Sequence, residues 1–543
     1  MAPGSCEENE SMLKYHQVNI LKPSEILKDT EKCLERNNNI TDDNHNNTDV
    51  YDDEEEIGPH YKSNCRGVLA QCMVSGAVLL LTAGLGMPIG FSAILLPQLN
   101  ETNATVQVTP EIGSWIASIH SLASPLGALL SGPLLDAVGR RGSLQLATLP
   151  LILGWIMIGV ANDTWSILTG RFLAGFSVGM GAVPSQVLIG ECTDASLRGT
   201  LVTIGMVAYS GGILLVYALG ATFRWSIVAF AGTVLPLVAL VSLSFVCESP
   251  VWLMRRGKRE DAKKALLWLR GGDEKQVKSE VSMLETRIQE VLECASITMT
   301  LSEKLSNAKA TVFHPGVMKP LIVINVFFLL QVLSGTYLIV FYGVDLIRDV
   351  AGEEIDNYLA AVMTSLIRFV FCGLACILLF RVGRRTIGIV SALGTAVSSL
   401  ALAGYILFNS GDSFISTYIV GVCLLLYVSF NTIGLMTLPG LLIGELLPQR
   451  ARGIGGGFTM FVYNFGLFGV TKVFPVVKAM VGMAGVFGIF GISAILEGLF
   501  IWLALPETRN RTLEDIEDYF KDGNVLWIKR RRSQKQHLMN AEA

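Results

Sequence analysis

Apolar residues of the chain gather in twelve long runs, which polar segments separate. A helix needs about 20 mostly apolar residues to cross the hydrocarbon core of a bilayer, which is roughly 30 Å thick. The runs have about this length, so the pattern predicts twelve membrane-spanning helices. They cover residues 70–97, 113–134, 144–160, 166–188, 200–220, 224–246, 319–346, 357–380, 385–408, 415–445, 452–480 and 483–505.

One long polar segment, residues 248–318, divides the runs six and six. Its amphipathic stretches at 262–270 and 281–291 predict short surface helices instead of spans. The chain is therefore predicted to be an all-α membrane protein with two six-helix halves. We expect an amino-terminal tail at 1–65, the halves at 66–247 and 319–505, the linker at 248–318 and a carboxy-terminal tail at 506–543.

Composition agrees with this pattern. The 543 residues are 51% hydrophobic and only 16% charged, with a mean hydropathy of +0.49, whereas about 25% charged residues is usual in soluble proteins. Most cytoplasmic enzymes and nucleic-acid-binding proteins are thereby excluded. Residues 1–65 differ from the rest, because 15 Asp and Glu stand there against 6 Lys and Arg. This acidic tail is too polar to bury a core, and we expect it to be disordered.

Basic residues mark one side of the predicted membrane domain. They cluster in the linker and in the short loops that hold Arg140 and Arg384, while the loops 98–112 and 347–356 on the other side are acidic or poor in basic residues. Cytoplasmic loops carry an excess of Lys and Arg. We therefore expect a multi-pass protein of the plasma membrane with both termini and the linker in the cytoplasm.

Three glycosylation sequons lie on the side predicted to face outward. They begin at Asn100, Asn103 and Asn162, and each has a threonine two residues later. Their position agrees with the orientation derived from the basic residues. We expect these asparagines to be the glycosylated sites.

Three motifs at span ends occur twice, in the same order. Each pair stands after equivalent spans of the two halves, and the two Glu-to-Arg motifs even have the same internal spacing. Such a repeat argues for duplication of a six-helix unit, which is the architecture of a secondary transporter. The pairs are Asp136 to Arg141 with Arg381 to Arg385, Glu191 to Gly199 with Glu445 to Gly453, and Glu248 to Pro250 with Glu507-Thr508.

These motifs carry a resemblance to the sugar porter family of the major facilitator superfamily over residues 66–520. Further matching pieces are Gly170 to Gly175, Pro184 to Glu191 and Pro506 to Glu517. Among sugar porters, the chain most resembles insect facilitated trehalose and glucose transporters. The resemblance implies a twelve-helix major facilitator fold with two pseudo-symmetric halves. It also implies facilitative transport of a hexose or a trehalose-like disaccharide by alternating access.

The repeated charged residues form a predicted gating network. Carboxylates and guanidinium groups at cytoplasmic helix ends can form bidentate pairs that clasp neighbouring helices in one state and part in another. The resemblance implies that they latch the outward-open state. The alternative is that the arginines only follow the positive-inside distribution and the carboxylates are solvated. The network comprises Asp136, Arg140, Arg141, Glu191, Arg198, Glu248, Arg384, Arg385, Glu445, Arg452 and Glu507.

A sugar site needs amide side chains and an aromatic face. Gln331 matches the first glutamine of the family pattern in the seventh span, but Val332 replaces the second and Tyr337 replaces the usual asparagine. Candidate substrate contacts are therefore fewer than in a typical glucose carrier, and each could equally be a helix-to-helix hydrogen bond. The candidates are Gln331, Tyr337, Tyr342, Asn464 and Arg368.

Arg368 stands about eleven residues into the eighth span, roughly 16 Å deep at 1.5 Å per residue. A charge near the midplane costs about 2.5–3.5 kcal/mol on insertion scales, so it must face a water-filled cavity or a partner. Sugar carriers usually have a neutral amide at the matching position. Arg368 is either an arginine paired inside the bundle or a residue that shifts the substrate towards an anionic solute.

An absent carboxylate bears on the energetics of transport. Proton-driven members of the family carry an aspartate just after a Gly-aromatic pair in the first span, where this chain has Ser92 after Gly90-Phe91. A proton relay then lacks its usual carrier. We expect uniport in place of proton symport.

Other functions remain as alternatives. They are a carrier of a non-sugar or anionic solute, and a non-transporting sugar sensor on the same scaffold. The chain shows no nucleotide loop, nucleophile constellation or metal-ligand spacing, so we expect no enzyme activity, no catalytic residues, no metal and no cofactor. A small sugar and the lipid bilayer are the expected partners, with no nucleic acid and no obligate protein partner.

Overall fold

The computed structural model describes residues 65–101, 106–295, 315–351, 356–408, 414–448, 452–509, 511, 513–521 and 527. The predicted acidic tail, apart from Cys65, and Asn103 lie outside these residues. Contacts divide the chain into a unit of Met1–Lys62 with Glu285–Thr298 and a unit of Ser63–Leu284 with Met299–Ala543. The second unit holds every candidate span and is called the body below.

Within the described residues, eleven helices are long and apolar enough to cross a membrane. The last of them, α21 (Arg452–Ala504), continues through Gly482, whose φ of 66° and ψ of −179° are not helical. Gly482 therefore separates two spans, which gives twelve in total. The prediction of twelve helices in two halves is confirmed.

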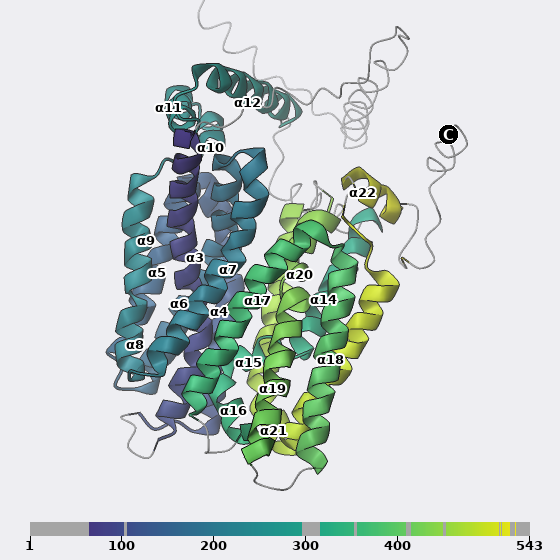
Figure 1. Ribbon diagram of the computed structural model, residues 1–543. Coiled ribbons are helices and arrows are strands. Elements are labelled where there is room, and N and C mark those ends of the chain that lie inside the picture. The colour runs from purple at the N-terminus through teal and green to yellow at the C-terminus, as the bar shows by residue number, and fades with distance from the viewer. Residues whose placement is uncertain are drawn as a thin grey trace, which may run out of the picture. The chain divides into compact units, whose positions relative to one another are not determined.

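The first half runs from α3 to α9 and is followed by the linker helices (Figure 1). Its helices are α3 (Cys65–Leu99), α4 (Pro110–Val138), α5 (Arg140–Gly159), α6 (Thr164–Cys192), α7 (Ala195–Gly220), and α8 (Trp225–Gly232) with α9 (Val234–Phe245), which together form the sixth span. The linker holds α10 (Pro250–Arg255), α11 (Arg259–Leu269) and α12 (Glu274–Ala295).

The second half repeats this order with two interrupted spans. The seventh span consists of α14 (Pro315–Leu333), α15 (Leu338–Phe341) and α16 (Gly343–Ala351), and α17 (Asn357–Arg381) and α18 (Arg384–Phe408) follow. The tenth span consists of α19 (Phe414–Asn431), a π-helical turn, η3 (Thr432–Met436), and α20 (Leu438–Leu446). After α21, the amphipathic helix α22 (Leu513–Lys521) is the last helix that the structure describes in this half.

The two ends of the body are distinguished by these helices. In Figure 1, α10, α11 and α22 lie at one end, which we call the linker end, and α16 lies at the other, the far end. Asn100 and Asn162 are exposed beyond α3 and α5 at the far end. Asp163 caps α6 there, and its bonds from Ser166 hold the pKa of that carboxyl below its usual value.

The hydrophobic pattern predicts a continuous seventh span, and the structure breaks it. The helix stops after Leu333, and Gly335 takes a φ of +84°, a left-handed conformation that glycine adopts without a steric penalty. A side chain at Gly335 would also collide with Phe490 and with the Tyr427 hydroxyl. Backbone breaks at membrane depth occur where they are buried in protein or line a cavity, so this segment points to the functional centre.

Glycines bring α4 and α6 into close contact. A Cβ atom at Gly179 would lie 1.9 Å from the carbonyl oxygen of Ser124, and one at Gly127 would lie 1.9 Å from that of Phe176. Membrane helices pack by such small-residue contacts because lipid offers no hydrophobic driving force between them. The two glycines thus set the spacing of the second and fourth spans.

Gly179→Ala is expected to lower the stability of the purified protein by about 1–3 kcal/mol, because the added methyl forces the two backbones apart. Thermal unfolding in detergent measures the effect. Gly190→Ala on the same helix is the matched control, since nothing lies within 4 Å of its Cβ position. Equal unfolding temperatures for the two variants would contradict the close contact.

Candidate functional site

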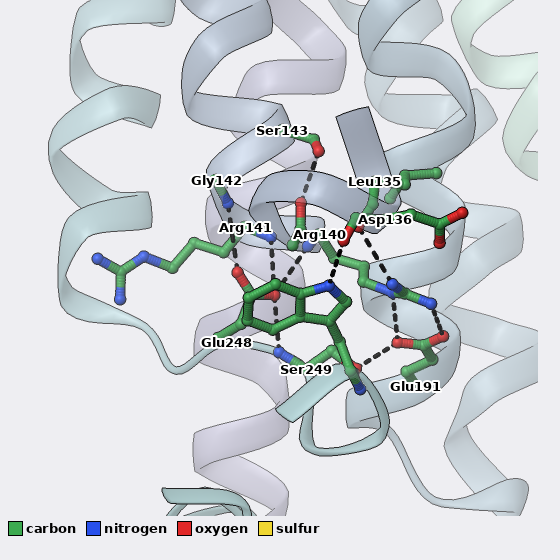
Figure 2. Close-up of polar contacts among 11 residues, drawn as sticks. Leu135, Asp136, Arg140, Arg141, Gly142, Ser143, Glu191, Glu248 and Ser249 are labelled. Atoms are coloured by element: carbon green, nitrogen blue, oxygen red, sulfur yellow. Dashed lines mark hydrogen bonds and ion pairs between the residues drawn. The ribbon is translucent and has the colours of Figure 1, made fainter. Parts of the chain in front are cut away.

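A charged cluster joins three helix ends at the linker end of the first half. Arg140, at the start of α5, donates from Nε and Nη2 to the two carboxylate oxygens of Glu191 on α6, each at 2.9 Å. Figure 2 shows the two side chains facing one another. Only 6% of the Arg140 side chain and 19% of the Glu191 side chain are exposed. This is the bidentate geometry that makes an arginine–carboxylate pair strong.

Glu248 caps the start of α5. Its carboxylate accepts from the backbone N–H groups of Arg140 at 2.9 Å, Arg141 at 3.0 Å and Gly142 at 3.4 Å. These N–H groups have no partner within the helix, and the positive end of the helix dipole favours an anion there. Gly139 leaves the space, because a Cβ atom would lie 2.4 Å from Glu248 Oε2. The repeated Gly-Arg-Arg motif is therefore a carboxylate-binding helix start.

Neighbouring residues complete the cluster. The Ser249 hydroxyl donates to Glu191, so Glu248 and Ser249 hold two different helices. Asp136 takes part through its backbone, since its carbonyl oxygen accepts from Trp252 Nε1 at 3.1 Å and from Arg256 at 2.6 Å. The sequence suggested a side-chain role for Asp136, and the structure shows this main-chain role.

The second half contains the same cluster. Arg384 donates from Nε and Nη2 to Glu445 Oε1 at 3.3 and 3.0 Å. Glu507 accepts from the backbone N–H groups of Arg384 at 2.9 Å and Arg385 at 3.2 Å. Thr508 donates to Glu445 at 2.5 Å, as Ser249 does to Glu191. The three paired motifs thus become one structural unit that occurs twice.

The remaining members of the predicted network lie apart from these pairs. Arg141 donates to the carbonyl of Val246 at 2.8 Å, and Arg385 donates to that of Trp502. Arg198 is exposed and donates to the carbonyl of Thr193 at 3.3 Å. The side chain of Arg452 lies outside the described residues.

Each of these clusters lies within one half. The partners of Arg140 come from the first half, and those of Arg384 come from the second. In this conformation the clusters therefore hold together the helices of a single half. They do not join one half to the other through any contact between the described residues.

The halves contact one another through two pairs of spans, α4 with α21 and α7 with α17. Near the far end, Lys472 on α21 donates to the Ser114 hydroxyl on α4 at 2.7 Å. The Tyr217 hydroxyl on α7 donates to the carbonyl of Val340 in the broken seventh span at 2.9 Å. Towards the linker end, Cys376 on α17 contacts the carbonyl of Thr203 on α7 at 3.6 Å.

Buried polar atoms without a partner occur in both halves, and in the second half they include two amides. Gln331 is 1% exposed and Asn431 is fully buried. Gln331 Oε1, both amide atoms of Asn431 and Ser365 Oγ have no hydrogen-bond partner among the described residues. Buried polar atoms are nearly always paired, and each exception calls for a ligand, a water or a strain that explains it. Amides with unpaired atoms are suited to a polyhydroxylated ligand.

The other predicted substrate contacts are partly used within the protein. Tyr342 donates to the carbonyl of Thr471 at 3.1 Å, and Asn464 donates to that of Met460 at 2.8 Å. The ring of Tyr337 lies 6.1 Å from that of Tyr463. Arg368 is 2% exposed and lines a small cavity. Gln331 and Asn431, which stands beside the π-helical turn, have polar atoms without a hydrogen-bond partner, whereas the Tyr342 hydroxyl is paired.

Arg171 is a central residue to which the sequence assigned no role of its own. Its side chain is fully buried, and it donates to Ser92 Oγ, to the Pro88 carbonyl and to the Ile116 carbonyl. Ser92 is the position at which proton-driven sugar porters are expected to carry an aspartate. In this structure the partners of Arg171 are therefore neutral oxygen atoms. A proton-driven sugar porter is expected to have a carboxylate at the position of Ser92.

A further polar cluster, which the sequence did not predict either, joins the linker to the first half. Gln71 on α3 donates to Asp194 at 2.8 Å and accepts from the Asp194 backbone N–H at 2.9 Å. Arg270 at the end of α11 pairs with Asp194 at 3.0 Å and with Glu280 on α12 at 2.7 Å. Residues so distant in sequence give no local signal of their contact.

Twelve spans in two repeated halves, with a polar centre at a broken helix, define a membrane transporter of the major facilitator class. Residues 84–520 match the family model described as "Sugar (and other) transporter". The chain belongs to this family. It is a multi-pass membrane protein and not an enzyme, because the similar proteins are transporters.

Curated relatives and solved structures agree with this family. The chain is 31% identical over 459 residues to a facilitated trehalose transporter, Tret1, of Culex quinquefasciatus, covering 83% of this chain and 86% of the relative. It is 30% identical over 454 residues to trehalose transporter 1 of Drosophila melanogaster, covering 83% of this chain and 52% of that one. Several relatives are thus about twice as long as the region matched.

The fold is that of a solved sugar symporter. The structure of the proton:xylose symporter XylE bound to 6-bromo-6-deoxy-D-glucose matches with a TM-score of 0.67 at 20% identity, over 84% of this chain and all of that one. An inward-open structure of XylE from E. coli matches with a TM-score of 0.65 at 19% identity, over 82% of this chain and 98% of that one. These likenesses establish the major facilitator fold.

The two clusters differ in ways that predict unequal costs. Glu191→Gln is expected to lower the free energy of unfolding by about 2–3 kcal/mol, because it leaves a nearly buried guanidinium with a poorer partner. Glu445→Gln is expected to cost about 1 kcal/mol, because that pair uses one oxygen and is 19% and 22% exposed. Thermal unfolding of the purified variants measures both. A larger loss for Glu445→Gln would contradict the difference.

Proposed function

We propose that the protein is a facilitative transporter of a sugar, a hexose or a trehalose-like disaccharide, that works by alternating access. The observation that carries the proposal is a pair of buried amides in the second half, because Gln331 Oε1 and both amide atoms of Asn431 lack partners among the described residues. Hydroxyl groups of a sugar can both donate to and accept from such amides. The trehalose transporters among the relatives support this substrate class.

Uniport follows from the surroundings of Arg171. Its partners are a serine hydroxyl and two carbonyls, and none of these gains or loses a proton near neutral pH. The buried carboxyl of Glu497 on α21 is not among the residues that line the central cavity. Downhill flux of sugar therefore needs no accompanying proton in this mechanism.

We propose that the protein lies in the plasma membrane and that its linker end faces the cytoplasm. The basic linker and the exposed sequons Asn100 and Asn162 at the far end support it. Asn103 belongs to the same proposed glycosylated segment. The tails, 1–65 and 506–543, and the linker, 248–318, are then cytoplasmic, and function requires no other protein.

Uptake into proteoliposomes tests the transport proposal. Labelled D-glucose and trehalose are offered with and without a proton gradient, and protein-free liposomes set the background. We expect saturable uptake of at least one sugar that equilibrates at the outside concentration and does not respond to a protonophore. Accumulation driven by the proton gradient, or a proton current during uptake, would overturn uniport. Binding without any flux would favour the sensor.

The clusters at the linker end are proposed to keep the helices of each half together during the transition between states. Arg140→Gln and Arg384→Gln are expected to slow the maximal uptake rate at least several-fold and to leave the order of preferred sugars unchanged. Both arginines lie at the linker end and are not part of the proposed site at Gln331 and Asn431, so we expect the affinity for sugar to stay unchanged. Competition assays with a panel of sugars measure the preference. An altered preference at an unchanged rate would contradict this role.

A further inference from the structure

Arg368 is a buried cation at the centre of the second half. It lies on α17 and is 2% exposed. Its Nη2 donates to the carbonyl of Thr336 at 3.1 Å, and its Nη1 lies 3.2 Å from the sulfur of Met436. A carbonyl and a thioether are both neutral, so these contacts leave the positive charge uncompensated.

No carboxylate among the described residues compensates this charge. The ionisable side chains next to Arg368 are Tyr337, Tyr217, Tyr427 and Cys372, which are neutral near pH 7 in their ordinary forms. A guanidinium stays charged in proteins. Charges inside a membrane protein usually pair with one another or face a substrate pathway. Arg368 therefore lacks the counter-charge that a purely structural arginine would have.

Glu497 does not pair with Arg368. It is a fully buried carboxyl on α21, but the partners of the Arg368 guanidinium are the Thr336 carbonyl and the Met436 sulfur. No ion pair between the described residues joins the two side chains.

Arg368 lines a cavity to which both halves contribute. Ile213 and Tyr217 come from α7 of the first half, and Thr364, Ser365 and Arg368 come from α17 of the second half. The cavity measures about 10 Å³, which is room for one water molecule. Because its walls belong to different halves, a movement of the halves apart would widen it.

Arg368 contacts both irregular segments of the second half. The carbonyl that it binds belongs to Thr336, whose hydroxyl donates to the backbone carbonyl of Gln331 at 3.2 Å. The sulfur that it contacts belongs to Met436 in the π-helical turn, which begins directly after Asn431. The segments that Arg368 contacts are therefore those that carry Gln331 and Asn431 in the chain.

We propose that Arg368 binds a carboxylate carried by the sugar itself, so that the preferred substrate is a hexuronate, a sugar acid with one negative charge. The inference rests on the proposed sugar transport. The planar guanidinium matches a carboxylate with two parallel hydrogen bonds. One arginine balances one charge, which favours a monoanion over a phosphate dianion. Ser365, with its unpaired hydroxyl, lies in the same cavity and supplies a further donor.

The test compares three sugars of nearly the same shape in proteoliposomes: D-glucuronate, its neutral amide D-glucuronamide, and D-glucose. We expect the protein to take up glucuronate at least tenfold faster than glucuronamide, which corresponds to about 1.4 kcal/mol. Uptake of glucuronate moves one negative charge per cycle, so a membrane current accompanies it. Glucose with added acetate must not reproduce that current, because the carboxylate has to belong to the sugar.

Substitutions locate the preference at Arg368. In Arg368→Gln the ratio of glucuronate to glucuronamide uptake is expected to fall to about one, and Arg368→Lys is expected to retain part of it, since lysine keeps the charge but loses the fork. Arg381→Gln is the matched control, because Arg381 is an exposed arginine on the same helix. Its ratio is expected to equal that of the unmodified protein.

Two outcomes would overturn the inference. One is equal uptake of glucuronate and glucuronamide by the unmodified protein. This measurement does not depend on the folding of any variant. The other is an unchanged ratio in Arg368→Gln. Should no sugar be transported at all, sugar transport itself fails. Thermal stabilisation by glucuronate, present in the unmodified protein and lost in Arg368→Gln, would then still support the carboxylate site, and its absence would remove that too.

Discussion

The lack of water in a bilayer core forces every polar group there to find a partner inside the protein. Most of the buried polar groups in this protein have such a partner. Arg171 is surrounded by oxygen acceptors, and the helix starts at Arg140 and Arg384 are each capped by a carboxylate. Several buried side chains lack a partner among the described residues, and Gln331 and Asn431 are the amides among them beside the irregular segments of the second half. We propose that a polar ligand binds there.

The same constraint explains why the repeated motifs lie at span ends. Only at the membrane surface can carboxylates cap helix starts and bind guanidinium groups at low desolvation cost. Glu248 and Glu507 cap the helix starts, and each leaves no room for a side chain on Gly139 or Gly383. The guanidinium groups bind Glu191 and Glu445. Duplication of the half-unit duplicated this solution. Each half is thereby braced as a separate body, as alternating access requires.

The sequence predicted what depends on local pattern. Run length predicted twelve spans, and the repeated motifs predicted a charged network at the span ends. The sequence did not say which residues pair, and the structure pairs Arg140 with Glu191 and Arg384 with Glu445. The break at Gly335 was missed, because hydropathy is insensitive to backbone angle. The contacts of Arg171 with Ser92 were also missed, because they join helices 79 residues apart in the chain. Absence of a partner, as at Asn431, is visible only once all neighbours are placed.

The two buried arginines show how the halves have different tasks. Arg171 in the first half donates to three oxygen atoms, whereas Arg368 in the second half contacts one carbonyl and one sulfur. An arginine that donates to three oxygen atoms holds helices together, and one beside a cavity with a single oxygen acceptor is suited to bind a ligand. The broken seventh span and the π-helical turn lie beside Arg368. We therefore propose that the second half carries recognition.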